Sequence, residues 1–196
     1  MDAGQILHEL TYSEGLPKEA LKAASAQRVE MLPLFVEEIE TYLALEPAPR
    51  AKPTPLFFIF HLLGEWKEKV AYRPLARLLR IPGQEVDAIF GDGITTTGHR
   101  VMAAVFNGDP DPLYQIVLNP NADEYLRASM CEALAMVTLR GELDRDLAGR
   151  FLRDGLHRDA AAGGVVCLGR LAKRHCDARD ERPENSGEEG FRPGLH

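Results

Sequence analysis

The segment VMAAVFNGDPDPLYQIVLN, residues 101–119, places two apolar helical stretches on either side of a short turn. The turn NGDPDP is rich in glycine, aspartate and proline, which are residues that favour turns and end helices. The same order of apolar helix, turn and leucine-lined second helix occurs in residues 57–81 and 130–154. The segment is therefore one of three predicted helical hairpins.

The turns assigned to these hairpins contain Gly64, Gly108 and Gly141, which are 44 and 33 residues apart. Helical hairpins at such spacing are the signature of an α-solenoid, in which each helix pair buries its apolar face against the next pair. No stretch alternates polar and apolar residues as a strand does. We predict an all-α fold, an α-solenoid of antiparallel helix pairs with at least six helices between Met1 and Asp154 and no sheet.

An upstream helix is predicted from residues 28–46, RVEMLPLFVEEIETYLALE. Met31, Phe35, Ile39 and Leu43 follow one another at four-residue steps, which is typical of the buried face of a helix. Pro33 must lie early in this helix, because proline in a helix interior removes a backbone hydrogen bond. Residues 47–55 contain four prolines and form a connection between helices.

The composition is that of a globular domain, with 196 residues, of which 45% are hydrophobic and 27% are charged. A net charge of −7 without a basic stripe is unfavourable for binding a phosphate backbone, so no nucleic-acid partner is expected. The longest apolar stretch, residues 55–64, is too short to span a membrane, and no signal peptide is recognisable. We expect a cytoplasmic protein with no membrane partner.

The three cysteines are irregularly spaced and form neither a disulfide framework nor a CxxC zinc pair. Cys131 lies among apolar neighbours in SMCEALAM, and no nearby residue would activate it as a nucleophile. It is interpreted as a small core residue.

Several longer stretches carry a family resemblance. LLGEWKEKVAYRPLARLL, residues 62–79, resembles HEAT-like repeats. ILHELTYSEGLPKEALKAA, PTPLFFIFHLLGEW and RASMCEALAMVTLRGEL together resemble a bacterial family known as domain of unknown function 1186, over about residues 1–154. The resemblance implies a HEAT-like helical fold but no agreed reaction or catalytic residue. Some members add a cysteine-rich zinc motif, which is absent here, so no zinc is implied.

A metal site is one hypothesis for the first hairpin. His61 and Glu65 are four residues apart on one helix, a spacing that can direct both side chains to one ion, with His99 or Glu68 as a third ligand. In the competing interpretation, His61 is a partly buried residue hydrogen-bonded to a neighbour and Glu65 is solvated. The second is favoured because a metal needs several convergent ligands.

GDGITTTGHR, residues 91–100, has three glycines and could hold an anion at a helix start, but no strand precedes it and no phosphate-loop pattern is present. We interpret it as a helix N-terminus capped by Thr95 or Thr96. In the same way, Asp109 or Asp111 is predicted to cap the helix that follows NGDPDP.

A second site hypothesis concerns Trp66, which follows an aromatic cluster at helical spacing. Core packing is the favoured role of this tryptophan. Alternatively, Trp66 reaches a surface groove at the helix end, with Arg73 and Arg127 as further groove candidates.

Two functions from different classes are compatible with these features. The favoured one is a helical-repeat interaction module that binds an unknown protein partner and has no intrinsic catalysis or cofactor. The alternative is a small metal-dependent enzyme that uses His61, Glu65 and His99. A structural remnant without present activity is a third possibility.

The sequence changes character after Asp154, where small residues precede a segment rich in charge, glycine and proline. If GC-rich codons are assumed from Gly155 onward, a shift of the reading frame by one nucleotide can yield apolar residues at helical spacing, including the string WQSAIAML, which resembles the continuation of the family. We therefore expect residues 155–196 to be a frameshifted, largely disordered tail that truncates the solenoid. The last helix pair would then expose apolar surface and self-associate.

Overall fold

The computed structural model describes residues 1–45 and 52–162 of the chain. This part contains ten α-helices and no β-strand, which confirms the all-α prediction and the expectation of at least six helices. A 3-10 turn, η2 (Lys69–Ala71), and a π-helical turn, η3 (Ile94–Gly98), complete it. The helices are α1 (Ala3–Tyr12), α2 (Lys18–Ala26), α3 (Arg28–Ala44), α4 (Leu56–Trp66), α5 (Tyr72–Leu78), α6 (Gly83–Phe90), α7 (His99–Ala104), α8 (Asp111–Val117), α9 (Glu124–Leu139) and α10 (Arg145–Ala162).

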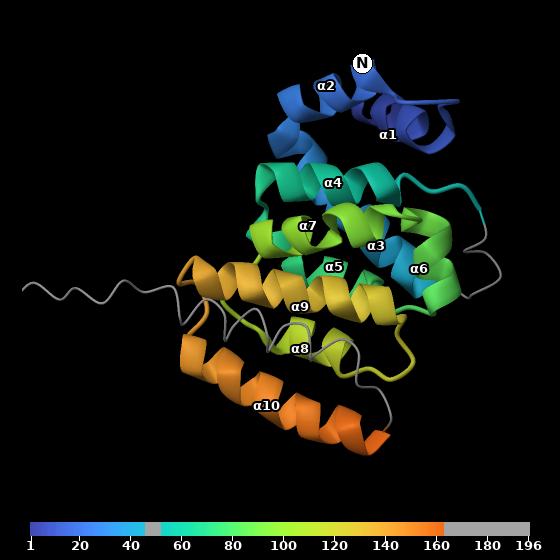
Figure 1. The fold of residues 1–196 in the computed structure, drawn as a ribbon. Coiled ribbons are helices and arrows are strands. Elements are labelled where there is room, and N and C mark those ends of the chain that lie inside the picture. Colours follow the sequence, from blue (N-terminus) through green and yellow to red (C-terminus); the bar gives the residue numbers. More distant parts are fainter. Residues whose placement is uncertain (46–51, 163–196) are drawn as a thin grey trace, which may run out of the picture.

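The helices are arranged in two stacked rows (Figure 1). In one row, α4 packs against α7 and contacts η3 through His61, and both α7 and η3 pack against α9. In the other row, α3 packs against α5, and α5 packs against α8. The α1–α2 hairpin covers one end of this stack, and α10 packs against α9 at the opposite end.

The α4 helix and the η3–α7 segment run in the same direction. His61 Nε2 lies 2.8 Å from Thr97 Oγ1, and one turn further along, Gly64 faces Val101. His61 and Thr97 are 36 positions apart in the sequence, and Gly64 and Val101 are 37 apart. Contacts therefore advance along both segments together, which shows that the segments are parallel. The same separation recurs in both rows: hydrogen bonds join Ser129 to Ile94, Arg77 to Glu40, Tyr72 to Asp109, Arg80 to Gln115 and Arg140 to Ala103, with 35 to 37 positions between partners.

Gly64 does not occupy a turn, contrary to the sequence interpretation. It is buried inside α4, where an added Cβ would lie 2.9 Å from both methyl groups of Val101. The turn after α4 is instead made by Lys67, which adopts a left-handed φ of 57°. Gly108 and Gly141 are turn glycines as predicted, with φ of 98° and 75°. Because Gly64 lies inside a helix and Gly108 lies in a turn, the 44 residues between them do not measure the length of a repeat.

The core follows the predicted apolar faces with local corrections. Met31, Phe35 and Ile39 of α3 are fully buried, but the face continues through Tyr42 rather than Leu43, because a helix turns every 3.6 residues rather than every four. Cys131 is fully buried, as expected.

Two further details refine the sequence interpretation. Val70, an apolar residue of the predicted hairpin over residues 57–81, is 65% exposed, because it lies in η2 before α5 begins. Asp109 Oδ1 accepts from the N–H of Asp111, the first residue of α8, at 3.1 Å, while the N-cap position itself is held by Pro110.

The last described helix, α10, continues through residue 154 to Ala162, so the predicted helix end near Asp154 lies eight residues too early. Residues 163–196 lie outside the described residues. The domain boundary and the frameshift therefore stay predictions.

We expect Gly64→Ala to lower the free energy of unfolding by about 1–2 kcal/mol in urea denaturation. Overpacking against Val101 costs about 1–3 kcal/mol, whereas the better helix propensity of alanine returns up to about 1 kcal/mol. Val101→Ala removes both opposing methyl groups. The free energy of unfolding of the double variant should therefore decrease by at least about 1 kcal/mol less than the sum of the decreases in the two single variants.

Gly149→Ala is the matched control, because Gly149 also lies in a helix but its added Cβ meets only the flexible end of Arg153, at 3.5 Å. This variant should be neutral or stabilising by up to about 1 kcal/mol. Equal effects at Gly64 and Gly149 would contradict a close contact between α4 and α7.

Tyr72 provides a second test of packing between the hairpins. Its buried hydroxyl donates to the backbone oxygen of Asp109 at 2.9 Å, and burial raises the pKa of the phenol. Tyr72→Phe should lower the free energy of unfolding by about 1–2 kcal/mol, because the carbonyl of Asp109 loses its donor. Tyr125→Phe, at a side chain that is 62% exposed, should change it by less than about 0.5 kcal/mol.

Candidate acidic cleft

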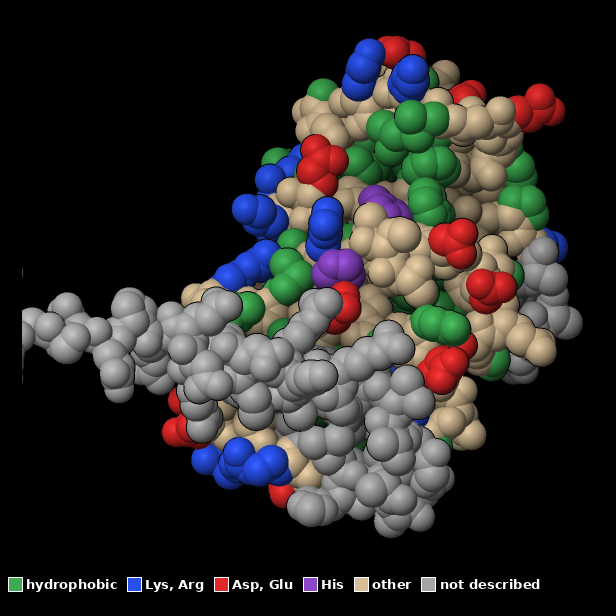
Figure 2. Space-filling view, in the orientation of Figure 1, with side chains coloured by type: hydrophobic (Ala, Val, Ile, Leu, Met, Phe, Trp, Pro, Cys, Tyr) green, Lys and Arg blue, Asp and Glu red, His purple; other side chains and the backbone are tan. Residues whose placement is uncertain are grey.

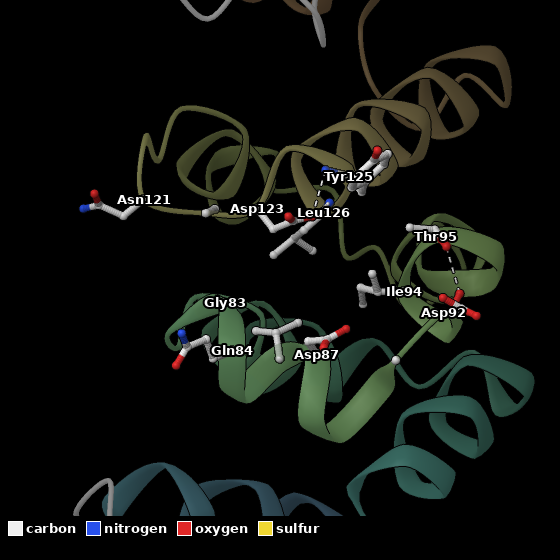
Figure 3. A pocket seen from close by; sticks show the side chains of 13 residues that line it. Gly83, Gln84, Asp87, Asp92, Ile94, Thr95, Asn121, Asp123, Tyr125 and Leu126 are labelled. Carbon is white, nitrogen blue, oxygen red and sulfur yellow. Dashed lines mark hydrogen bonds between the residues drawn. The ribbon is translucent and has the colours of Figure 1, made fainter.

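A cleft of about 580 Å³ lies between α6, η3 and the N-terminal end of α9 (Figure 3). Two separate segments of the chain, residues 83–95 and residues 121–126, therefore meet around one space. Its lining consists of Gly83, Gln84, Val86, Asp87, Gly91, Asp92, Ile94, Thr95, Asn121, Ala122, Asp123, Tyr125 and Leu126.

The N-terminus of α9 forms one side of this acidic cleft. Asp123 is the N-cap, and its Oδ1 accepts from the backbone N–H groups of Tyr125 at 2.9 Å and Leu126 at 3.2 Å. A capping aspartate satisfies amides that a helix start leaves unpaired, which fixes the backbone there. Tyr125 is consequently presented on a rigid helix end, largely exposed to solvent.

The π-helical turn η3 forms the opposite side. Thr95 and Thr96 do not cap a helix, contrary to the sequence interpretation: both hydroxyls donate to the backbone oxygen of Asp92 at 2.9 Å. The turn is held against α9 because Ser129 Oγ donates to the oxygen of Ile94 at 2.8 Å. Single π-helical turns are rare and are frequently found at functional sites.

The charge of the acidic cleft is of one sign. Asp87, Asp92 and Asp123 line it, and none of the described residues that line it is a lysine, arginine or histidine. The Asp87 and Asp92 side chains are exposed and form no ion pair with any described residue. Between these carboxylates, Ile94 and Leu126 are apolar and buried. The arrangement is suited to a cationic group attached to an apolar one.

Figure 2 shows a related separation of charge on one face of the molecule. Lysine and arginine side chains gather toward the left edge, where α4, α7 and α9 end, and acidic side chains predominate toward the side of α6. The described end of the molecule that carries the cleft is thus the more acidic one.

The residues of the metal hypothesis are not brought together. Both ring nitrogens of His61 are engaged: Nδ1 lies 2.7 Å from the oxygen of Phe57, and Nε2 lies 2.8 Å from Thr97 Oγ1. Glu65 is exposed, and His99 Nδ1 lies 3.6 Å from Glu132 rather than beside His61. Glu68, the other candidate ligand, pairs with Arg28.

Within residues 1–45 and 52–162, no three His, Cys, Asp or Glu side chains are grouped so that they could hold a metal ion. The arrangement matches the competing interpretation, in which His61 is hydrogen-bonded within the helix bundle and Glu65 is solvated.

The groove candidates likewise occupy three separate environments. Trp66 is buried, stacks on Phe35 with ring centroids 5.5 Å apart, and therefore has the core role that the sequence favoured. Arg73 is exposed and pairs with Asp109 at 2.7 Å. Arg127 is buried, and its Nε donates to the oxygen of Val117 at 2.8 Å. None of the three lines the acidic cleft.

Sequence reasoning missed the acidic cleft, although part of its signal was visible. The segment GQEVDAIFGDG, residues 83–93, carries aspartates close to glycines. Nothing in the sequence indicated that residues 121–126 would lie opposite this segment.

Comparison with known proteins places the chain in a family. Among the described residues, no helix has the length and apolar character needed to span a membrane. No curated protein and no solved structure matches the chain. The family model described as a protein of unknown function (DUF1186) matches residues 1–181, which confirms the resemblance and carries it past the predicted limit at residue 154. The chain belongs to this family of unknown function, DUF1186.

Proposed function

We propose that this chain is a HEAT-like helical-repeat scaffold that binds a protein partner and has no catalytic activity of its own. The recurrent separation of 35 to 37 residues between hydrogen-bonded partners carries this proposal. A fixed separation is expected when similar helix pairs stack in sequence, because each residue then meets its counterpart in the next repeat. The pairs would be α4 with α5, α7 with α8, and α9 with α10.

The acidic cleft is the proposed binding surface. Stacked repeats present continuous surfaces that bind partners, and the cleft lies where α9 follows η3 in the stack. It has three aspartates and no basic residue among its described lining residues, which favours a segment that carries lysine or arginine. Tyr125, which is 62% exposed, would contact the apolar part of that segment, since aromatic side chains are enriched in protein interfaces.

The metal-dependent enzyme is not proposed as a second function, because the protein itself engages both ring nitrogens of His61. Cytoplasmic location remains a proposal. So does self-association through the C-terminal repeat, which is supported by the exposure of Leu139 on α9 and Leu147 on α10.

We expect selection from a random displayed-peptide library on the immobilised full chain to enrich peptides that contain lysine or arginine. The affinity of an enriched peptide, measured by fluorescence anisotropy, should fall at least about tenfold when Asp87→Asn and Asp92→Asn are combined, because the pair supplies about 1.4 kcal/mol or more of electrostatic attraction. Raising the salt concentration should weaken the same complex.

The combination of Glu14→Gln and Glu37→Gln is the control, since it removes two exposed carboxylates outside the cleft. It should leave the affinity unchanged within about twofold. Enrichment of acidic peptides, or an equal loss of affinity in both double variants, would refute the acidic cleft as the binding surface.

A further inference from the structure

A continuous set of polar contacts joins α4 to η3 beside the acidic cleft. The backbone oxygen of Phe57 lies 2.7 Å from His61 Nδ1, and His61 Nε2 lies 2.8 Å from Thr97 Oγ1. Thr97 Oγ1 in turn lies 2.8 Å from the backbone oxygen of Gly93, one turn earlier in the chain. We call these three contacts the His61 chain. The imidazole is partly buried, with the Phe57 and Phe60 rings 4.6 and 5.5 Å from it.

The number of available protons decides how many of these contacts can be hydrogen bonds. The oxygens of Phe57 and Gly93 only accept, so the two ends of the His61 chain both require a donor. Neutral histidine has one N–H and threonine has one O–H, which gives two protons for three contacts. The imidazolium ion has two N–H groups, so with the threonine hydroxyl it supplies all three.

The tautomer of the neutral ring decides which of the three contacts is lost, because the neutral chain has one proton too few. In one tautomer, His61 carries its proton on Nδ1 and donates to the oxygen of Phe57. Nε2 then accepts from Thr97, and the threonine hydroxyl is no longer available to the oxygen of Gly93. In this tautomer, loss of the second proton from His61 removes a hydrogen bond within η3, whereas a proton on Nε2 alone would remove the one within α4.

We propose that His61 is a proton-sensitive switch of the acidic cleft, in which the imidazolium ion completes the His61 chain and holds η3 closed. In this proposal the neutral ring is the Nδ1–H tautomer, so the contact between Thr97 and Gly93 is present while His61 is protonated and is lost as the pH rises and the ring loses its proton. Because η3 supplies Ile94 and Thr95 to the cleft, the wall becomes more mobile at higher pH.

The titratable residues next to His61 and η3 are Glu65, Asp92 and His99. Glu65 lies one turn further along α4 and is exposed, and Asp92 precedes η3. Neither forms an ion pair with the imidazole. After η3, His99 faces Glu132 of α9 at 3.6 Å, so protonation of His99 would strengthen a second contact in the same direction. The test therefore includes a variant that removes His99.

The experiment measures hydrogen-exchange protection of the amides of residues 94–99 in the full chain at pH 5 and pH 8, after division by the intrinsic exchange rates. We expect protection in the native protein to be about fivefold higher at pH 5, the effect of one ordinary hydrogen bond. Thr97→Val should abolish this ratio, whereas Thr97→Ser, which keeps the hydroxyl, and His99→Gln should retain it.

Nitrogen NMR of the His61 ring gives a second reading that does not require a variant. It should show protons on both nitrogens at pH 5 and on Nδ1 alone at pH 8. A proton on Nε2 alone at pH 8, an unchanged ratio in Thr97→Val, or loss of the ratio in His99→Gln would each overturn the proposal. No partner is present in these measurements, so their failure would leave the scaffold function untouched.

Discussion

The contact between α4 and the η3–α7 segment is the constraint on which the rest of the structure depends. Gly64 lets the backbone of α4 approach Val101 more closely than any larger residue would allow. This approach brings His61 within 2.8 Å of Thr97 and sets both segments in the same direction. With α7 fixed in this way, α9 packs on its other side, and Ser129 reaches the oxygen of Ile94.

The acidic cleft is a consequence of the same arrangement. The η3 turn lies between α4 and α9, and α6, which precedes η3 in the chain, lies outside the row formed by α4, α7 and α9. The cleft is the space left between α6, η3 and α9. The turn is held from both sides, by His61 from α4 and by Ser129 from α9. A π-helical turn is rare, and these two contacts stabilise it in addition to the local hydrogen bonds that Thr95 and Thr96 donate to Asp92.

The sequence predicted the helices better than it predicted the contacts between them. The period of Met31, Phe35 and Ile39 depends only on the geometry of a single helix, so the buried face of α3 could be identified from it. Glycine is common both in turns and where two helices approach closely, and the sequence alone does not distinguish these roles for Gly64. The position of Val101 in the folded chain does, because it lies against Gly64. The acidic cleft could not be predicted, since it requires residues 83–95 and 121–126 to meet across α7 and α8.

The shared direction of η3–α7 and α9 has an electrostatic consequence for the cleft. Both segments begin beside it, and the N-terminus of a helix carries a partial positive charge from its aligned peptide dipoles. The negative charge of Asp123, the α9 cap, is therefore partly balanced by its own helix, and Asp92 lies similarly ahead of η3. Asp87 lies in the second half of α6, where the helix dipole is negative. The attraction of the cleft for a cation is consequently uneven and is concentrated on the side formed by α6.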